Sequence, residues 1–291
     1  MKLTCVTATF NAIKSGNREA LIRCVESVAQ LKTEHEHLIY DGASTDGTVE
    51  LLRELEAKTS GLKVVSEPDT GIYNALNKGV RDAKGEWFYV LGCDDYIEFP
   101  VVMDQLVADI ADGVDCCIST VNRDGVPYHF VNLFELRHIF QWIPYCHQGA
   151  LVRVGTMRRL NGFDESYRIC ADCDFFIRAH KAQCRFCYKY RSFACFSAGG
   201  VNETNRPATN AEYQRMIATQ FGVSDSDMKV YARTLTLPFR VVFPYMFSRD
   251  LALFIGAWYM VYFRIRRKTF DMIKNVCAYR CGMKRAACIL F

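Results

Sequence analysis

Short apolar runs alternate with helical patterns from residue 3 to residue 121, and this alternation constrains the fold more than any other feature of the chain. Runs rich in β-branched and aromatic residues predict strands over 3–9, 37–40, 62–66, 86–91 and 114–121. Between them, apolar residues at helical spacing predict helices over 18–31, 48–57, 72–83 and 101–110. Strands and helices that alternate through short connections are typical of an open, largely parallel α/β sheet.

Polar and acidic residues follow the predicted strands, at the edge where ligands of such sheets bind. The residues after the first four strands include Thr9, Asn11, Asp41, Asp69, Gly71, Asp94 and Asp95. Aspartates thus recur at three successive strand ends, and their like charges need partners. Mg²⁺ or Mn²⁺ suits Asp94 and Asp95, whereas the hydrogen-bond donors of a ribose or base suit Asp41. Any one of these residues alone is more typical of a turn, so their joint occurrence carries the prediction.

Two other kinds of site are disfavoured. No GxGxxG or GxxxxGK[ST] motif follows the first strand, which argues against a dinucleotide fold and against a P-loop. Two C-x₂-C pairs, Cys170 with Cys173 and Cys184 with Cys187, have the spacing of zinc ligands. The first pair runs into a helical pattern, and the second lies in a strand-like run where residues three apart face opposite sides. We therefore expect reduced thiols and not structural zinc.

Seven stretches of the chain together resemble the family 2 glycosyltransferases in order and spacing. They are TATFN (7–11), YDGASTDGT (40–48), SEPDTGIYNALNKGV (66–80), GEWFYVLGCDD (85–95), CHQGALV (146–152), GFDESYRICADCDFFIRA (162–179) and SAGGVN (197–202). Each stretch alone is a weak signal, but the combination is specific and covers roughly residues 2–205. The resemblance implies a GT-A domain over 1–210, with a Rossmann-like, mostly parallel central sheet flanked by helices.

The resemblance also implies a nucleotide-sugar donor and an inverting transfer to an acceptor hydroxyl. It places donor-binding residues at Thr9, Asn11, Asp41, Asp69, Gly71, Lys78 and Asp94. Asp94 and Asp95 take the place of the family's metal-binding DxD motif, which implies Mn²⁺ or Mg²⁺ as the cofactor. This chain has Gly92 where the family often has an acid, so fewer carboxylates would carry the metal.

The catalytic base is expected on a helical segment further along the chain. The resemblance places it at Asp172, which we favour over Asp174, although the family's Glu-Asp pair is Ala171-Asp172 here. His147 is either a structural hydrogen bonder or a catalytic-site residue that contacts the diphosphate or the acceptor. Arg178 follows Asp174 by one helical turn and is expected to form an ion pair with it.

The region 211–291 differs in composition from the rest of the chain. Residues 238–291 hold ten Lys/Arg and two Asp/Glu out of totals of 36 and 32, and residues 251–263 carry no charge. That apolar segment is shorter than the roughly 20 residues that span a bilayer. Because the basic run 264–268 follows it, we expect an interfacial or re-entrant helix at an anionic membrane surface. The alternative is a core helix with a solvated basic face.

These observations predict a glycosyltransferase that moves one sugar from a nucleotide donor, a UDP-sugar, to a lipid-linked or oligosaccharide acceptor in bacterial surface polysaccharide assembly. With no secretory signal visible, we expect it in the cytoplasm, peripheral on the inner face of the plasma membrane, without a nucleic-acid partner. One alternative is a catalytically inactive nucleotide-binding scaffold at the membrane, which the retained Asp94, Asp95 and Asp172 oppose. Another is a metal-dependent nucleotidyltransferase, for whose phosphate loop Lys14-Ser15-Gly16 is a meagre candidate.

Overall fold

The computed structural model describes residues 1–124, 126–128, 146–197, 200, 204–224 and 226–227 of the chain. The chain divides into two units, Met1–Leu237 and Pro238–Phe291, and every described residue belongs to the first. The predicted membrane-associating segment 251–263 therefore lies outside the described residues, as does most of the region 211–291. Among the described residues, no helix has both the length and the apolar character needed to cross a membrane.

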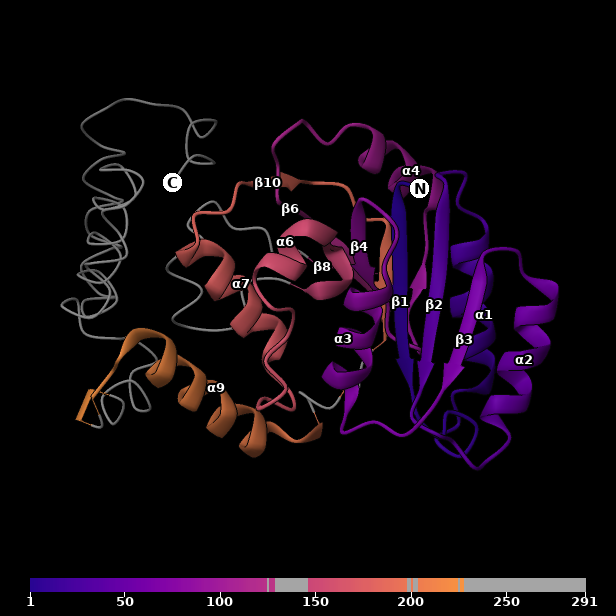
Figure 1. The fold of residues 1–291 in the computed structure, drawn as a ribbon, viewed down its shortest axis with the longest axis horizontal. Helices are drawn as coiled ribbons and strands as arrows, with labels where there is room; N and C mark the ends of the chain where they lie inside the picture. Colours follow the sequence, from indigo (N-terminus) through magenta and orange to yellow (C-terminus); the bar gives the residue numbers. More distant parts are fainter. Residues whose placement is uncertain (125, 129–145, 198–199, 201–203, 225, 228–291) are drawn as a thin grey trace, which may run out of the picture. The chain divides into compact units, whose positions relative to one another are not determined.

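A seven-stranded sheet forms the centre of the described domain (Figure 1). In spatial order its strands are β10 (Phe186–Lys189), β6 (Cys116–Ser119), β9 (Ala150–Arg153), β4 (Trp87–Val90), β1 (Leu3–Thr9), β2 (His35–Asp41) and β3 (Leu62–Ser66). Neighbouring strands are parallel, except that β9 runs antiparallel to both β4 and β6. The predicted α/β fold with a mostly parallel sheet is confirmed.

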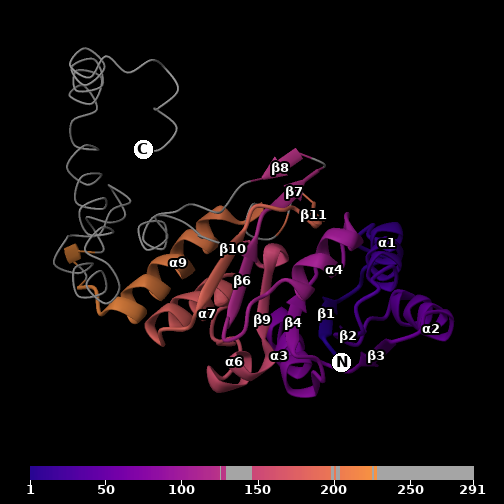
Figure 2. The ribbon, with the colours of Figure 1, turned by 90° about the horizontal axis from the view of Figure 1, so that it is seen from above.

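Helices cover both faces of this sheet (Figure 2). One face carries α3 (Ile72–Asp82), α6 (Val154–Arg159) and α7 (Ala171–Lys181), and the other carries α1 (Arg18–Ala29) and α4 (Pro100–Ala108). The side chains of β4 therefore alternate between these two layers of helices. Phe88 and Val90 line a space with residues of α6 and α7, whereas Trp87 and Tyr89 pack into a core with residues of α1 and α4.

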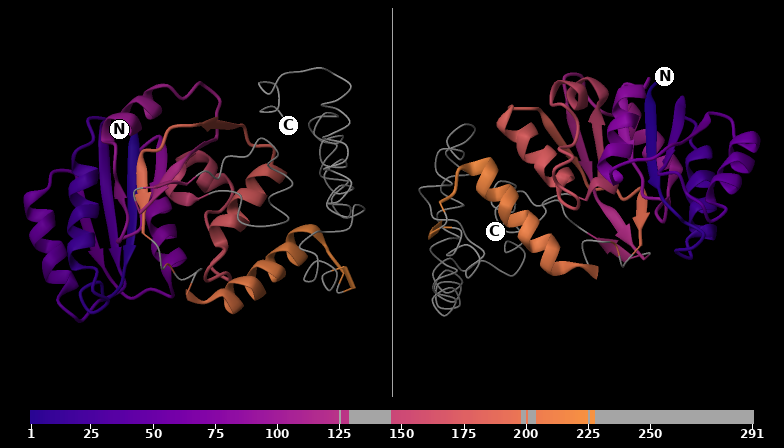
Figure 3. Two further views of the ribbon diagram at one scale, coloured as in Figure 1. Left: turned by 180° about the vertical axis from the view of Figure 1, so that it is seen from behind. Right: turned by 60° about the horizontal axis from the view of Figure 1, so that its bottom comes forward.

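Two further helices extend the domain at its edges. Helix α2 (Thr48–Lys58) packs beside β3, and α9 (Arg206–Phe221) packs against α7 (Figure 3). The boundary predicted between residues 210 and 211 falls inside α9, whose buried residues include Tyr213, Met216 and Ile217. At least the first part of the predicted C-terminal region therefore packs on the same domain, and the division into two domains stays a prediction.

The strand predicted over 114–121 is divided between two sheets. β6 ends at Ser119 in the main sheet, and the chain enters a second sheet of β5 (Tyr96–Ile97), β11 (Ala194–Phe196), β7 (Val121–Arg123) and β8 (Val126–Tyr128). At the crossing, the N–H of Thr120 donates to the carbonyl of Lys189, and its hydroxyl contacts that of Ser192 at 3.0 Å. The apolar pattern runs through this point without a break, so no local signal marks the division.

The carboxyl ends of the parallel strands meet at one edge of the main sheet. β1 pairs with β2 until Thr9 lies opposite Asp41, and β2 pairs with β3 until Asp41 lies opposite Ser66. The loops after these three strands therefore begin side by side. This register brings together residues that are separated by more than 20 positions in the sequence.

A buried histidine in β2 makes the stability of the fold depend on pH. His37 is 2% exposed, its Nε2 lies 3.0 Å from the Thr7 hydroxyl, and its Nδ1 has no partner among the described residues. Burial, and then the charge of His35, lower the pKa of His37 to about 3. Below its ordinary pKa of about 6.5, the unfolded chain therefore takes up a proton at His37 that the folded chain does not.

As the pH falls from 6.5 towards the folded pKa of His37, we expect the free energy of unfolding to decrease by about 1.4 kcal/mol per pH unit because of this histidine. Urea denaturation of the wild type and of a His37→Leu variant at pH 7.5 and pH 5 measures the effect. The wild type should lose about 2 kcal/mol more than the variant over this interval. Equal losses in the two proteins would show that His37 is protonated in the fold.

Candidate active site

Asp41 ends β2 and is almost fully buried, with 1% of its surface exposed. Its carboxylate accepts hydrogen bonds from the N–H and hydroxyl of Ser44, at 2.9 and 2.5 Å, and from the hydroxyl of Ser66, at 2.7 Å. These bonds hold the loop after β2 against the end of β3. They occupy three of the roughly four lone-pair sites of the carboxylate. Contact between Asp41 and a nucleotide-sugar donor thus stays a prediction. One acceptor position of the carboxylate is left for it.

The loop after β1 is built on the same serine. Asn11 adopts a positive φ of 49°, a left-handed conformation in which asparagine is several-fold enriched among the non-glycine residues. Its N–H donates to the Ser44 hydroxyl at 2.7 Å, and its side-chain oxygen accepts from the N–H of Thr45 at 3.1 Å. Asn11 therefore connects the first two loops of the sheet edge, whether or not it also contacts a ligand.

Phe10 adds an apolar surface that the sequence analysis did not single out. Its side chain is 62% exposed, and a Cβ atom on Gly42 would lie 3.2 Å from its ring and 2.9 Å from the Asp69 carboxylate. The ring and the carboxylate thus border the same stretch of backbone. Beside them, the buried hydroxyl of Thr9 lies next to the Cys93 thiol and has no oxygen or nitrogen partner within the described part of the chain.

The loop after β3 and helix α3 carry three more of the predicted donor-binding residues. Asp69 accepts a hydrogen bond from the N–H of Gly71 at 2.9 Å, and Gly71 has a φ of 138°, which favours glycine. The ammonium group of Lys78 lies 2.8 Å from the carboxylate of Glu67 and donates to the carbonyl of Pro68 at 3.1 Å. Lys78 is thus held at the sheet edge by an ion pair, from which a diphosphate would have to draw it.

Asp94 and Asp95 follow β4 and have different environments. Asp95 is 3% exposed, and its carboxylate accepts from the side-chain amide of Gln148 at 2.7 Å and from the N–H of Ser197 at 3.0 Å. Burial, and then the charge of Asp94, raise the pKa of Asp95, while these two donors oppose the rise. Asp94 is partly exposed, and its carboxylate has no hydrogen-bond or ion-pair partner within the described ranges.

A divalent cation fits Asp94 better than Asp95. The metal role predicted for Asp95 stays a prediction: its carboxylate is buried, and Gln148 and Ser197 each occupy one of its acceptor positions. The described residues contain no group of three His, Cys, Asp or Glu side chains that would form a complete metal site. Mg²⁺ commonly binds through one or two carboxylates and substrate phosphates, so Asp94 would share Mn²⁺ or Mg²⁺ with the ligand.

Gly92 accounts for the departure from the family's acidic motif. A Cβ atom at this position would lie 2.5 Å from an Asp95 carboxylate oxygen and 3.0 Å from an Asp94 carboxylate oxygen. Both carboxylates fold back over the glycine, and any larger residue would displace them. The acid that is absent at position 92 therefore leaves room for the two that follow.

His147 and Asp172 form a hydrogen-bonded pair. Nδ1 of His147 lies 3.1 Å from Oδ2 of Asp172, whose other oxygen accepts from the N–H of Cys173 at 2.8 Å and from the Tyr73 hydroxyl at 3.3 Å. The two side chains are 33% and 12% exposed. They border a cavity of about 20 Å³ that is otherwise lined by apolar residues between the sheet and α7. In such surroundings the interaction between an imidazolium and a carboxylate is strong.

Their interaction raises the pKa of His147 and lowers the pKa of Asp172. Burial alone lowers the pKa of His147, but the hydrogen bond and charge of Asp172, followed by the charges of Asp95 and Asp94, raise it overall. Burial alone raises the pKa of Asp172, but the hydrogen bond and charge of His147 and the N–H of Cys173 lower it overall. Near neutral pH, Asp172 is therefore ionised, as a base must be.

A single 3₁₀ turn, η1 (His147–Gly149), connects this pair to the acids after β4. His147 contacts Asp172, and the next residue, Gln148, donates to Asp95. The backbone carbonyl of Gln148 accepts from the Tyr89 hydroxyl at 3.0 Å, which anchors the turn to β4. Gln148 was not among the residues predicted for the site. Its position next to a candidate catalytic residue was the signal available.

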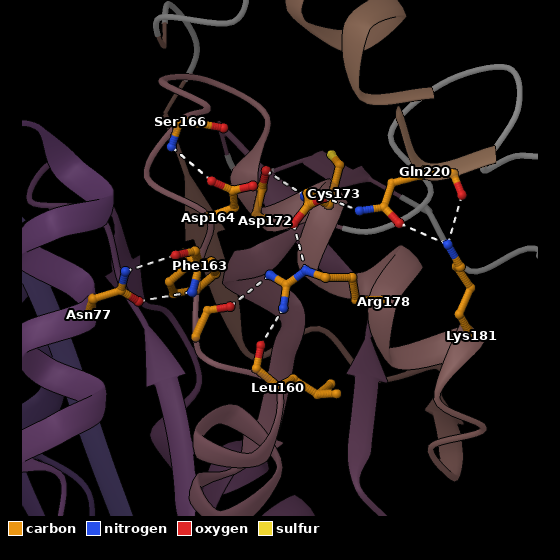
Figure 4. A network of polar contacts seen from close by, with 12 residues as sticks. Asn77, Leu160, Phe163, Asp164, Ser166, Asp172, Cys173, Arg178, Lys181 and Gln220 are labelled. Carbon is orange, nitrogen blue, oxygen red and sulfur yellow. Dashed lines mark hydrogen bonds and ion pairs between the residues drawn. The ribbon is translucent and has the colours of Figure 1, made fainter. Parts of the chain in front are cut away.

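Asp174 has a structural environment. Its side chain is 1% exposed and accepts from the Arg178 guanidinium and from the Gln220 amide, both at 2.7 Å. Arg178 also donates to the carbonyls of Leu160 and Gly162 (Figure 4). The predicted ion pair between Asp174 and Arg178 is thus present. The alternative in which Asp174 is the base stays a prediction that its environment opposes, because the permanent charge of Arg178 already pairs with its carboxylate and lowers its basicity.

We expect an Asp174→Asn variant to lose about 3–5 kcal/mol in the free energy of unfolding, because it leaves the Arg178 charge without its buried partner. The protein that remains folded at low temperature should keep its turnover number. Chemical denaturation and an activity assay on the same samples test both points, with Asp112→Asn, an exposed aspartate, as the control. A stable Asp174→Asn protein without activity would instead make Asp174 the base.

The fold and the site define an enzyme of the α/β class with acids at the carboxyl ends of its strands and a carboxylate–imidazole pair beside them. The profile of Glycosyl transferase family 2 matches residues 4–181. The chain belongs to this family and has a GT-A fold. This match confirms the resemblance seen in the sequence. It favours neither of the two alternatives, an inactive scaffold protein or a nucleotidyltransferase.

Among curated proteins, a PGL/p-HBAD biosynthesis glycosyltransferase of Mycobacterium tuberculosis is 29% identical over 160 residues, covering 53% of this chain and 62% of that protein. The chain thus matches less than two thirds of this relative.

Two solved structures share the fold. TarS 1-349 of S. aureus in complex with UDP-GlcNAc superposes with a TM-score of 0.60 at 19% identity, covering 81% of this chain and 70% of that chain. The mannosyltransferase PcManGT of Pyrobaculum calidifontis, in complex with GDP-Man and Mn²⁺, superposes with a TM-score of 0.62 at 14% identity, covering 96% and 84%. At these identities the likeness establishes the fold only.

Proposed function

We propose that this glycosyltransferase transfers one sugar, with inversion, from a nucleotide-sugar to a hydroxyl group of a glycan acceptor. The observation that carries the proposal is the His147–Asp172 pair, which η1 connects directly to the acids after β4. One ionised carboxylate, held by a neighbouring imidazole, suits a single displacement. A double displacement with retention would use two carboxyl groups about 5 Å apart, as in retaining glycosidases.

In the proposed reaction, an Asp172 oxygen accepts the proton of the acceptor hydroxyl while the acceptor oxygen bonds to the anomeric carbon. The bond between that carbon and the diphosphate oxygen breaks, and the diphosphate leaves with the electron pair. His147 keeps Asp172 ionised and oriented through the bond to Oδ2. A divalent cation bound at Asp94 would act as a Lewis acid that neutralises the leaving diphosphate.

The proposed donor is a UDP-sugar, bound over the carboxyl ends of β1 to β4. Structural relatives were solved with UDP-GlcNAc and with GDP-Man, which supports a nucleotide-sugar and leaves the base to be tested. The exposed Phe10 ring and the Asp69 carboxylate offer an apolar face and a polar group beside the Asn11 loop. Such a combination suits a nucleoside, whose base stacks on aromatic rings.

For the acceptor, we propose a lipid-linked glycan in bacterial surface polysaccharide assembly, with the enzyme on the inner face of the plasma membrane. The basic residues and uncharged segment 251–263 of the C-terminal region support membrane association. The relative named for PGL/p-HBAD biosynthesis is compatible with such an acceptor. Flotation with anionic liposomes tests the idea: the full chain should float, and a chain ending at residue 237 should not.

A screen of nucleotide-sugars with the purified full chain tests the transfer itself. We expect transfer, or slow hydrolysis, of one donor in the presence of Mn²⁺ or Mg²⁺, with UDP-sugars foremost. Product stereochemistry at the anomeric carbon should be inverted relative to the donor. A retained configuration would contradict the single-base mechanism, and full activity in EDTA would contradict the metal role.

A further inference from the structure

Helix α9 lies beyond the residues that the family profile matches, yet it is tied to α7 at two places (Figure 3). Gln220 of α9 donates to Asp174 in the first turn of α7 and accepts, through its backbone carbonyl, from Lys181 at the C-terminal end of α7 at 2.7 Å (Figure 4). Near the N-terminal end, Glu212 binds the loop that leads into α7. The second contact is the unusual one, because a single carboxylate binds successive backbone N–H groups of the loop.

The carboxylate of Glu212 accepts hydrogen bonds from three successive backbone N–H groups. They belong to Arg168 at 2.7 Å, Ile169 at 2.6 Å and Cys170 at 2.8 Å. The Glu212 side chain is only 14% exposed. Successive N–H groups that converge in this way form an anion-binding concavity, and here the protein supplies the anion itself. Cys170 is the N-cap residue of α7, and Asp172 follows two positions later.

We propose that Glu212 is a positioning residue for Asp172, so that α9 belongs to the machinery of sugar transfer. This inference rests on the function proposed above. The three bound N–H groups fix the position of the first turn of α7. In that position Asp172 faces His147 at hydrogen-bond distance. Without the carboxylate, the N–H of the buried Cys170 loses its partner, and the loop has to move to find another.

The groups that face Asp172 come from three elements. They are the imidazole of His147 from η1, the hydroxyl of Tyr73 from α3, and both the N–H and the thiol of Cys173 from α7 itself. The Tyr73 hydroxyl also donates to the Ile169 carbonyl at 2.7 Å, so the same loop is fixed from the α3 side. The pKa of Asp172 depends on its distance from His147, and that distance depends on the loop that Glu212 holds.

The test uses the full chain with Glu212→Gln, because the amide keeps the shape but presents an N–H₂ group to backbone donors. We expect kcat to fall by up to about 10²-fold, the cost of a displacement of about 1 Å, with the KM for the donor unchanged. The acid limb of the kcat/KM profile should move to higher pH, because Asp172 drifts away from His147. Glu212→Asp, which keeps the charge on a shorter side chain, should be intermediate and guards against misfolding of the first variant.

Gln220→Ala is the matched control, since it removes the other tie between α9 and α7. We expect it to lower the melting temperature and to leave kcat and the acid limb unchanged. If Glu212→Gln does only the same, Glu212 is merely structural and the proposal is wrong.

A measurement without substrate separates this proposal from the proposed function. NMR titration of the His147 imidazole should give a raised pKa in the wild type and a lower one in Glu212→Gln. An unchanged His147 pKa would overturn the positioning role even in an active enzyme. If no donor is ever turned over but the His147 pKa shifts as expected, the function fails and the positioning of Asp172 stands.

Discussion

An Asp172→Asn variant is expected to lose transfer activity by about 10²–10⁴-fold while it still folds and binds the donor. The amide oxygen of asparagine can still accept from the N–H of Cys173 while its NH₂ group donates to a neutral His147 Nδ1, so the start of α7 should keep its position. Only the capacity to take the acceptor proton is lost. Turnover assays, together with calorimetric titration of the donor, measure the two quantities separately.

Asp164→Asn is the control for this substitution, since it makes the same chemical change in an exposed residue of the preceding loop. It should have nearly wild-type turnover. An Asp172→Asn protein that is as active as this control would exclude Asp172 as the base. A loss of donor affinity that accounts for the whole loss of turnover would place Asp172 in the donor site instead.

His147, the partner of Asp172, should control how the transfer activity depends on pH. Burial raises the pKa of Asp172, and the hydrogen bond and charge of His147 bring it down again. In a His147→Gln variant the imidazole's hydrogen bond and charge are gone and only the hydrogen bonds from Cys173 still oppose burial, so the acid limb of kcat/KM should move to higher pH. A limb that stays in place would show that His147 does not control the ionisation of the base.

The second large effect is expected from Asp94→Asn, which should abolish the dependence of activity on Mn²⁺ or Mg²⁺ at ordinary concentrations. Loss of a group that only supports a metal ligand already costs about 10–100-fold in affinity or activity, and loss of a direct ligand should cost at least as much. The Asp94 carboxylate has no protein partner within the described ranges, so its replacement should leave the fold intact.

Asp95→Asn is the informative comparison, because Asp95 is bonded to Gln148 and Ser197. We expect this variant to be less stable and less active, with an unchanged Mn²⁺ concentration for half-maximal rate. Electron paramagnetic resonance of Mn²⁺ should show weak binding to the protein alone and tight binding once a nucleoside diphosphate is added. Tight binding without nucleotide, or a shifted Mn²⁺ requirement in Asp95→Asn only, would contradict the assignment to Asp94.

The strands and helices of the first half of the chain were predictable because their signals are local. A period of two or of 3.6 residues in the apolar positions is enough to locate β1 to β4 and α1 to α4, within a few residues at their ends. The exception is the strand predicted over 114–121, which the structure divides at Thr120. Contacts with Lys189 and Ser192 decide that division, and they lie about 70 positions further along the chain.

The candidate site was predictable in its residue types and positions, but not in the roles of neighbouring acids. Asp94 and Asp95 are adjacent, yet only one is buried against Gln148, which is 53 residues away in sequence. Asp172 and Asp174 lie on one helical turn, yet one faces His147 and the other is enclosed by Arg178 and α9. Nothing in the local pattern distinguishes the members of either pair.

The sequence by itself determined the class of fold and the family of the chain, and it predicted the edge of the sheet at which the candidate site lies, since each depends on patterns along the chain. Only the tertiary structure decided which carboxylates remain available for chemistry. The physical reason is that the ionisation and reactivity of a carboxylate depend on its burial and its hydrogen-bond donors. Here those donors come from η1, from the residues after β11 and from α9, far from the acids in the sequence.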